Sequence, residues 1–94
     1  AQPREDGRVV LDAAAARGAL AVRARRAGDR FWPLGAPGPK TLKRFLIDRK
    51  VPREDRARTP VVTLADRPAW VVGHRIDERF KVTPATEMVL ELQA

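Results

Sequence analysis

Apolar residues follow two different spacings along this chain, one helical and one extended. Residues 41–51 (TLKRFLIDRKV) place Leu42, Phe45 and Leu46 at i, i+3 and i+4, which is the spacing of a single helix face. Thr41 stands where a helix N-cap is expected, because its hydroxyl oxygen can accept a hydrogen bond from one of the first free amides. A proline follows the segment and ends it. The pattern therefore predicts one main helix over 41–51.

Downstream, the apolar residues gather in short β-branched or alternating runs separated by turn-forming residues. The runs are Val61–Leu64, Trp70–Val72, Ile76–Phe80 and Met88–Leu92. The charged connector 53–59 before them has room for a single helical turn. Four short strands with one main helix indicate an α+β fold, in which the helix packs on a small antiparallel sheet or sandwich.

The segment before the helix also alternates. In residues 19–26 (ALAVRARR), Leu20 and Val22 fall on one face, as expected for a half-buried strand. Residues 27–29 (AGD) are typical of a hairpin turn, with Arg30–Trp32 as the returning strand.

Two further stretches divide the chain. Residues 33–39 (PLGAPGP) hold three prolines and two glycines, so they predict a loop with fixed kinks. Residues 1–18 are interpreted as an N-terminal tail and linker, in which Val9–Leu11 is long enough for a short strand. The folded domain is then expected to span residues 19–94.

Composition excludes several kinds of chemistry. The 94 residues make one domain, and none of them is a cysteine, so disulfides, thiolate metal sites and cysteine nucleophiles are excluded. His74 is the single histidine and fits a structural or solvent-exposed role. Asp77 and Glu78 are expected to form salt bridges with Arg75 or Arg79. No glycine-rich phosphate loop is present, so no catalytic residue, metal or cofactor is expected within this chain.

Cellular context follows from the same composition. No stretch approaches the roughly 20 apolar residues of a membrane span. The lack of cysteine favours a reducing compartment, so a cytoplasmic location is expected. The chain begins at Ala1 instead of methionine, which suggests that it belongs to a larger protein.

Charge is the strongest functional signal in the sequence. The net charge is +7, and residues 23–58 hold twelve basic and four acidic side chains, a surplus of eight, while the rest of the chain sums to −1. Concentration in one segment indicates a polyanionic partner, and the alternative that arginine only supports solubility stays open. Lys40, Lys43, Arg44 and Lys50 lie opposite the apolar face of the predicted helix.

The start of that helix suggests how an anion would be held. Lys40 flanks the first turn, and Lys43 and Arg44 lie on it, where positive charge opposes the helix macrodipole. A phosphate bound there would relieve this cost. The few aromatic residues form no base-stacking motif. Trp70 is expected in the core, while Trp32 lies in the core, anchors its loop or stacks on a base. Recognition is therefore expected through phosphate positions.

Several motifs also resemble a known family. They are GDRFWPLG at 28–35, GPKTLKRF at 38–45, Val51-Pro52 with Arg56 and Pro60, and DERF at 77–80. Together they resemble the C-terminal domain of bacterial tRNA(Ile)-lysidine synthetase, a family also labelled a cell-cycle protein. The resemblance runs from about residue 19 to the end, and Pro39 replaces a polar residue that the family pattern favours.

The resemblance implies a role without catalysis. The family's parent enzyme uses ATP to activate the wobble cytidine of tRNA(Ile) and attaches lysine to it, with an SGGxDS loop in an N-terminal catalytic domain that has no counterpart here. The C-terminal domain is a β-rich unit similar to one in the phenylalanyl-tRNA synthetase β chain, and it holds the acceptor-stem side of the tRNA. The implied partners are tRNA(Ile), the catalytic domain of the same chain and, as an open option, a second copy of the parent. The expected RNA contacts are Arg30, Lys40, Lys43, Arg44, Lys50, Arg53, Arg56 and Arg79.

Two other functions stay open at this point. The chain can be a general basic module that binds DNA or ribosomes. It can also be a protein-interaction domain whose basic segment meets an acidic partner. Binding that survives high salt would favour the second, because phosphate contacts weaken steeply as salt rises.

Overall fold

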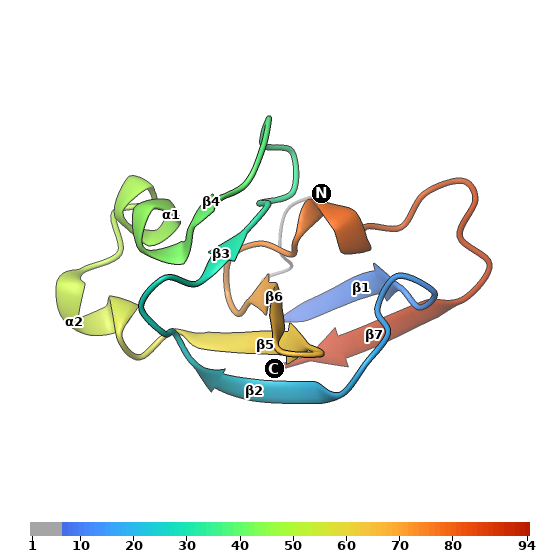
Figure 1. The fold of residues 1–94 in the computed structure, drawn as a ribbon, viewed down its shortest axis with the longest axis horizontal. Coiled ribbons are helices and arrows are strands. Elements are labelled where there is room, and N and C mark those ends of the chain that lie inside the picture. The colour runs from blue at the N-terminus through green and yellow to red at the C-terminus, as the bar shows by residue number, and fades with distance from the viewer. Residues whose placement is uncertain (1–6) are drawn as a thin grey trace.

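The computed structural model describes residues 7–94 as strands in three small antiparallel sheets with two short helices and one 3-10 turn (Figure 1). The elements in chain order are β1 Arg8–Asp12, β2 Leu20–Ala24, β3 Arg30–Phe31, β4 Lys40–Thr41, α1 Leu42–Asp48, α2 Arg53–Arg56, β5 Pro60–Leu64, β6 Arg67–Val71, η1 Glu78–Phe80 and β7 Val89–Gln93. The strands pair in the orders β2-β5-β6, β1-β7 and β3-β4. The α+β class expected from the sequence is confirmed.

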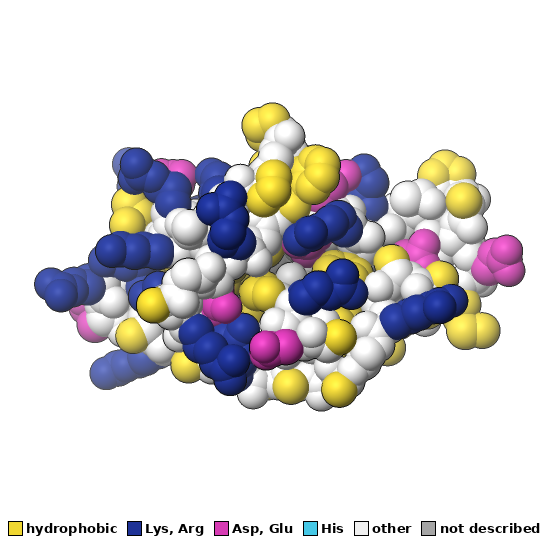
Figure 2. All heavy atoms as spheres, in the orientation of Figure 1, with side chains coloured by type: hydrophobic (Ala, Val, Ile, Leu, Met, Phe, Trp, Pro, Cys, Tyr) yellow, Lys and Arg dark blue, Asp and Glu magenta, His cyan; other side chains and the backbone are white. Residues whose placement is uncertain are grey.

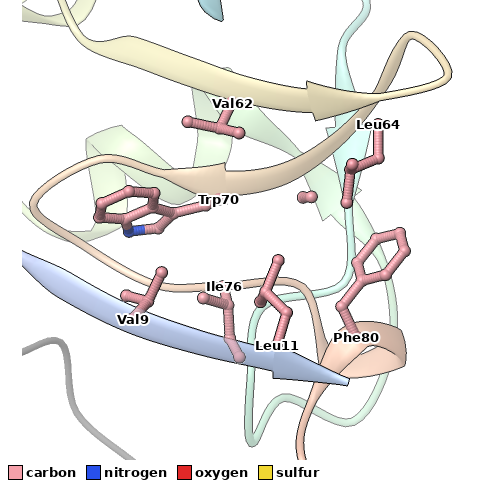
Figure 3. Packing of buried hydrophobic residues seen from close by; sticks show 8 residues of the cluster. Val9, Leu11, Val62, Leu64, Trp70, Ile76 and Phe80 are labelled. Atoms are coloured by element: carbon pink, nitrogen blue, oxygen red, sulfur yellow. The ribbon is translucent and has the colours of Figure 1, made fainter. Parts of the chain in front are cut away.

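Strand β5 is the centre of the molecule because both of its faces are buried. Side chains alternate along a strand, so Val62 and Leu64 face one side of the sheet and Val61 faces the other. The first side packs against the β1–β7 pair, and Figure 3 shows Val9 and Leu11 of β1 pointing toward the residues of β6 and the segment that follows it. The cluster on this side comprises Val9, Leu11, Val62, Leu64, Ala69, Trp70, Ile76 and Phe80.

The other side of the central sheet is covered by β3 and α1. The cluster here comprises Phe31, Leu42, Phe45, Leu46, Val61 and Val71. Phe31 and Phe45 meet edge to face with their ring centroids 4.9 Å apart, a favourable aromatic geometry. The predicted helix face of Leu42, Phe45 and Leu46 is therefore confirmed as the buried face.

The main helix is shorter than the pattern predicted. It ends at Asp48, because Lys50 adopts a left-handed conformation with φ of 61°. The Val51 amide then donates to the Leu46 carbonyl at 3.0 Å and closes the end of the helix. The single turn expected in the connector is present as α2.

The predicted hairpin between residues 19–26 and 30–32 is wrong. Strand β2 pairs with β5, and β3 pairs with β4. The reason lies in Asp29, whose carboxylate accepts from the Arg23 guanidinium at 2.8 and 3.0 Å and from the Arg26 amide at 2.8 Å. These bonds hold residues 26–29 in a turn that sends the chain away from β2.

Strand β2 alternates as predicted, but its apolar face is not half-buried. The exposed fractions of Leu20 and Val22 are 52% and 66%. Both share a face with buried β5 residues, yet β2 is the edge strand of its sheet. Arg23, on the opposite face, is the better covered residue.

The strand predicted at Ile76–Phe80 is a 3-10 turn instead. Ile76 and Asp77 each form an isolated bridge, and η1 begins directly afterwards. Asp77 caps this turn, since its carboxylate accepts from the Arg79 amide at 2.8 Å. A capping carboxylate competes with strand pairing for the local backbone amides, which explains the departure.

Near the N-terminus, the short strand left open at Val9–Leu11 is present as β1. It pairs along its whole length with β7, and Leu11 is fully buried. Residues 1–6 of the expected tail lie outside the described residues.

Candidate RNA interface

Helix α1 presents two exposed cations side by side. Thr41 caps the helix, its hydroxyl accepting from the Arg44 amide at 3.1 Å, and this bond fixes the first turn. Because the opposite face is buried, Lys43 and Arg44 point into solvent. Within residues 7–94 neither side chain forms a hydrogen bond or an ion pair. Both are therefore available to an anion.

Lys40 lies in β4, immediately before α1, and has an intramolecular partner. Its Nζ is 3.2 Å from the Asp48 carboxylate at the other end of the helix, and both side chains are partly exposed. Exposed ion pairs of this kind contribute little stability, about 0–1 kcal/mol. A phosphate can therefore compete with Asp48 for Lys40.

The predicted contact residues that follow α1 differ in whether their side chains already have an intramolecular partner. Lys50 and Arg53 are exposed, and no partner occurs for either among the described residues. Arg56 instead donates from Nη1 to the Val51 carbonyl at 3.1 Å and ties α2 to the end of α1. Arg58 just beyond is exposed and was missed by the sequence-based prediction, although it belongs to the same basic segment.

Two of the eight predicted contacts come from other elements. Arg30 is exposed in β3 and lies opposite Thr41 in the β3–β4 pair, next to the start of α1. Arg79 lies on η1, where its guanidinium donates to the buried Asp77 carboxylate at 2.8 and 2.9 Å. Of the salt bridges expected for Asp77 and Glu78, the one between Asp77 and Arg79 is confirmed, whereas Glu78 pairs with Lys81.

The structure thus brings seven of the eight residues onto one end of the molecule, and Arg79 lies apart on η1. Figure 2 shows Lys and Arg side chains crowded over the end that α1 and α2 form, and continuing across the face in view. We call this end the basic face; its residues are Arg30, Lys40, Lys43, Arg44, Lys50, Arg53, Arg56 and Arg58.

Not all of the surplus charge in residues 23–58 is free. Arg23 is bonded to Asp29, and Arg26 lies 3.5 Å from Asp66. The Arg23 hydrogen bonds to Asp29 raise the pKa of its guanidinium, so this pair stays ionised. Counting charges along the sequence does not separate such paired cations from free ones.

His74 lies between Arg49, at the end of α1, and the core residue Phe45. It accepts a hydrogen bond at Nδ1 from Arg49 Nε at 2.9 Å, and its ring lies edge to face with Phe45. Burial lowers the pKa of His74, and the nearby Arg49 charge lowers it further. The lowered pKa favours the neutral imidazole, whose Nδ1 accepts the hydrogen bond that positions Arg49, and this fits the structural role expected for His74.

Both tryptophans serve the fold. Trp70 is 2% exposed and lies in the first core cluster, as predicted. Trp32 is partly buried, and its Nε1 donates to the Ala36 carbonyl at 2.6 Å across the proline-rich loop. Loop anchoring, one of the roles left open for Trp32, is therefore confirmed, and base stacking stays a prediction.

Two other features are absent from the part of the chain that the structure describes. Within residues 7–94 no helix is long and apolar enough to cross a membrane. No group of three or more His, Asp or Glu side chains in this part of the chain is arranged to hold a metal ion.

The fold and its surface define the chain as a small basic α+β domain. Residues 20–92 match the family model described as the TilS substrate C-terminal domain, and the chain belongs to this family.

Individual relatives agree with this assignment. A tRNA(Ile)-lysidine synthase from Caldanaerobacter subterraneus is 47% identical over 77 residues, which are 82% of this chain and 16% of the relative. Another, from Symbiobacterium thermophilum, is 40% identical over 87 residues, which are 93% of this chain and 18% of the relative. A solved structure titled as the TILS C-terminal domain superposes with a TM-score of 0.75 at 35% identity, covering 95% of this chain and 71% of that one. The chain thus spans about a sixth of the length of these synthases.

Proposed function

We propose that this domain binds tRNA(Ile) for a tRNA(Ile)-lysidine synthase and performs no chemistry of its own. In this proposal the basic face contacts phosphates on the acceptor-stem side of the tRNA. The ATP-dependent attachment of lysine to the wobble cytidine takes place in the catalytic domain of the same enzyme. That catalytic domain is also the proposed protein partner. Whether the parent enzyme forms a homodimer stays a prediction.

One observation carries the proposal: Lys43 and Arg44 are exposed, adjacent and unpaired among the described residues. They are held on a helix whose other face is buried in the core, so their positions are fixed relative to the domain. Because α1 spans only seven residues, the proposal rests on these side-chain cations and not on the amides of the helix start. Cations fixed in this way contact phosphates and position an RNA without reading its sequence.

The test is a titration of the 94-residue chain with tRNA(Ile) over a series of salt concentrations. Each phosphate contact adds roughly 0.7–0.9 to the slope of log K against log salt. The double variant Lys43→Ala with Arg44→Ala is therefore expected to weaken binding and to flatten the slope by about 1–2 units. Its melting temperature should hardly change, since exposed substitutions usually alter stability by less than about 0.5 kcal/mol.

A matched control separates local contacts from net charge. Arg17→Glu removes the same two units of charge from an exposed residue in the loop after β1, at the end of the molecule opposite α1 (Figure 1). An equal loss of affinity and slope in this control would mean that only net charge matters. Duplex DNA competing as well as tRNA would favour the general nucleic-acid module, and binding unaffected by salt would favour a protein partner.

A further inference from the structure

The loop between β3 and β4, residues 32–39, projects from the body of the molecule, and its conformation is fixed at several points (Figure 1). The Leu34 amide donates to the Ile76 carbonyl at 3.0 Å, and the Ala36 amide donates to the Pro33 carbonyl at 2.9 Å. Trp32 Nε1 holds the Ala36 carbonyl from inside the loop. The loop is therefore rigid although it contains no regular secondary structure.

Two acidic residues from a distant part of the chain complete this support. Asp77 is fully buried, and its carboxylate accepts from the Trp32 amide at 2.9 Å. Glu78 accepts from the Gly35 amide at 3.0 Å, while its own amide donates to the Trp32 carbonyl at 2.6 Å. These bonds join positions more than 40 residues apart, so the orientation of the loop is set by the core and not by local sequence alone.

The supported loop presents an apolar tip. Its residues Gly35 to Pro39 carry no polar side chain, and Pro37 and Pro39 are exposed. Figure 2 shows hydrophobic side chains at this projecting tip, at the top of the view. A tip made of glycine, alanine and proline is narrow, and two of its residues lack an amide hydrogen.

Cations lie on both sides of this tip. On one side, Lys40 follows the loop directly and leads into α1 with Lys43 and Arg44. On the other side lies η1, with Arg79 and then Lys81, which forms an ion pair with the same Glu78 that holds Gly35. Figure 2 shows Lys and Arg side chains to the left and to the right of the apolar tip. The loop is thus a rigid apolar projection between two groups of positive charge.

This arrangement fits the minor groove of an RNA duplex. The minor groove of A-form RNA is wide and shallow, and it displays ribose 2′-hydroxyls between the phosphates of the two strands. A narrow apolar projection fits against the riboses and base edges, while cations on either side reach the two lines of phosphates. A single strand offers only one such line.

We propose that residues 35–39 enter the minor groove of an RNA stem, with Lys40 and the α1 cations on one strand and Arg79 and Lys81 on the other. This inference rests on the proposed tRNA-binding function and names the part of the domain that distinguishes RNA from DNA. In it Trp32 and Glu78 are positioning residues, because they hold the loop and do not themselves contact RNA.

The test compares an RNA hairpin with a DNA hairpin of the same sequence, each titrated with the 94-residue chain over several salt concentrations. Pro37→Gly removes apolar surface at the tip and leaves every anchoring bond in place. Trp32→Phe keeps an aromatic ring but removes the hydrogen bond to Ala36. Pro84→Gly makes the same change as the first variant in an exposed loop elsewhere on the molecule and serves as the control.

Both loop variants are expected to lose about tenfold in affinity for the RNA hairpin with an unchanged salt slope, because the lost contact involves no phosphate. The preference for RNA over DNA should shrink by the same factor. The control variant Pro84→Gly should bind both hairpins as the unmodified chain does. Melting curves identify any unfolding in Trp32→Phe, and Pro37→Gly keeps the test decisive if that variant unfolds.

The outcomes distinguish the two proposals. If the unmodified 94-residue chain binds neither hairpin nor tRNA, the proposed function is overturned together with this inference. A different result overturns only the minor-groove contact. It is that the unmodified 94-residue chain binds tRNA, but both loop variants either bind the RNA hairpin as well as the unmodified chain does or lose affinity for RNA and DNA equally. A changed salt slope in Pro37→Gly would also contradict it.

Discussion

At the scale of single residues, Asp77 links the core to the candidate RNA surface. Its fully buried carboxylate bonds the Arg79 guanidinium, the Arg79 amide and the Trp32 amide. The pairing with Arg79 was predicted from sequence because the two residues are neighbours. The bond to Trp32 could not be predicted, since its partners lie 45 residues apart and meet only when the fold forms.

Trp70 gives the clearest stability prediction. It is 2% exposed among the residues of the first core cluster, and truncating a buried tryptophan to alanine typically costs about 3–5 kcal/mol. Trp70→Ala is therefore expected to unfold the domain or to lower its free energy of unfolding by that amount, as measured by urea denaturation. Trp70→Phe should cost much less. A Trp70→Ala variant that melts like the parent and loses only RNA affinity would make Trp70 a binding residue.

His74 gives a prediction about pH. Burial and the Arg49 charge hold its pKa below the ordinary value of 6.5 in the folded state. The unfolded chain therefore binds the proton more tightly, and the free energy of unfolding falls as the pH drops below about 6.5. We expect the decrease between pH 7.5 and 5.5 to be smaller in His74→Gln, measured by denaturation at both pH values. The same decrease in the variant would show that other groups cause it.

At the scale of elements, α1 was predictable because its determinants are local. The apolar spacing, the Thr41 cap and the following proline all lie within the segment, and only its last turn was overestimated. Strand β2 was found by alternation, but its pairing with β5 depends on residues 40 positions away. The strand expected at Ile76–Phe80 was wrong because the sequence pattern of this segment cannot show that Asp77 caps a turn.

The cap of α1 can be tested directly. Removing an N-cap hydroxyl costs about 0.5–2 kcal/mol, and α1 is short enough to depend on its first turn. Thr41→Ala should lower the free energy of unfolding by about 1 kcal/mol, whereas Thr41→Ser, which keeps the hydroxyl, should restore most of it. If both variants are equally unstable, the loss comes from packing of the Thr41 methyl group and not from the cap.

The candidate site was predictable to a similar extent. Lys43, Arg44, Lys50 and Arg53 were expected to be exposed, because they belong to one polar, basic segment, and all four are exposed. What the sequence could not show is which cations are already occupied. Arg56 donates to the Val51 carbonyl, and that role follows from the turn between α1 and α2.

At the scale of the whole molecule, the domain has a basic face at one end and no recognised nucleotide site in its sequence. We expect the 94-residue chain not to bind ATP, because it contains no glycine-rich phosphate loop. Isothermal calorimetry with magnesium ATP should show no saturable heat, while tRNA titrated under the same conditions gives a binding signal. Saturable ATP binding at micromolar affinity would contradict the assignment of nucleotide chemistry to another domain.

The pairing of β1 with β7 has a consequence for how the domain forms on the ribosome. These are the first and last strands, and Leu90 and Leu92 of β7 pack against the cluster that contains Val9 and Leu11. The core cluster that contains Val9 and Leu11 therefore stays uncovered on one side until β7 has left the exit tunnel of the ribosome. Bringing the two strands together also closes a loop of nearly the whole domain, a slow entropic step. A chain truncated before Val89 is therefore expected to leave this cluster uncovered on the side that β7 occupies.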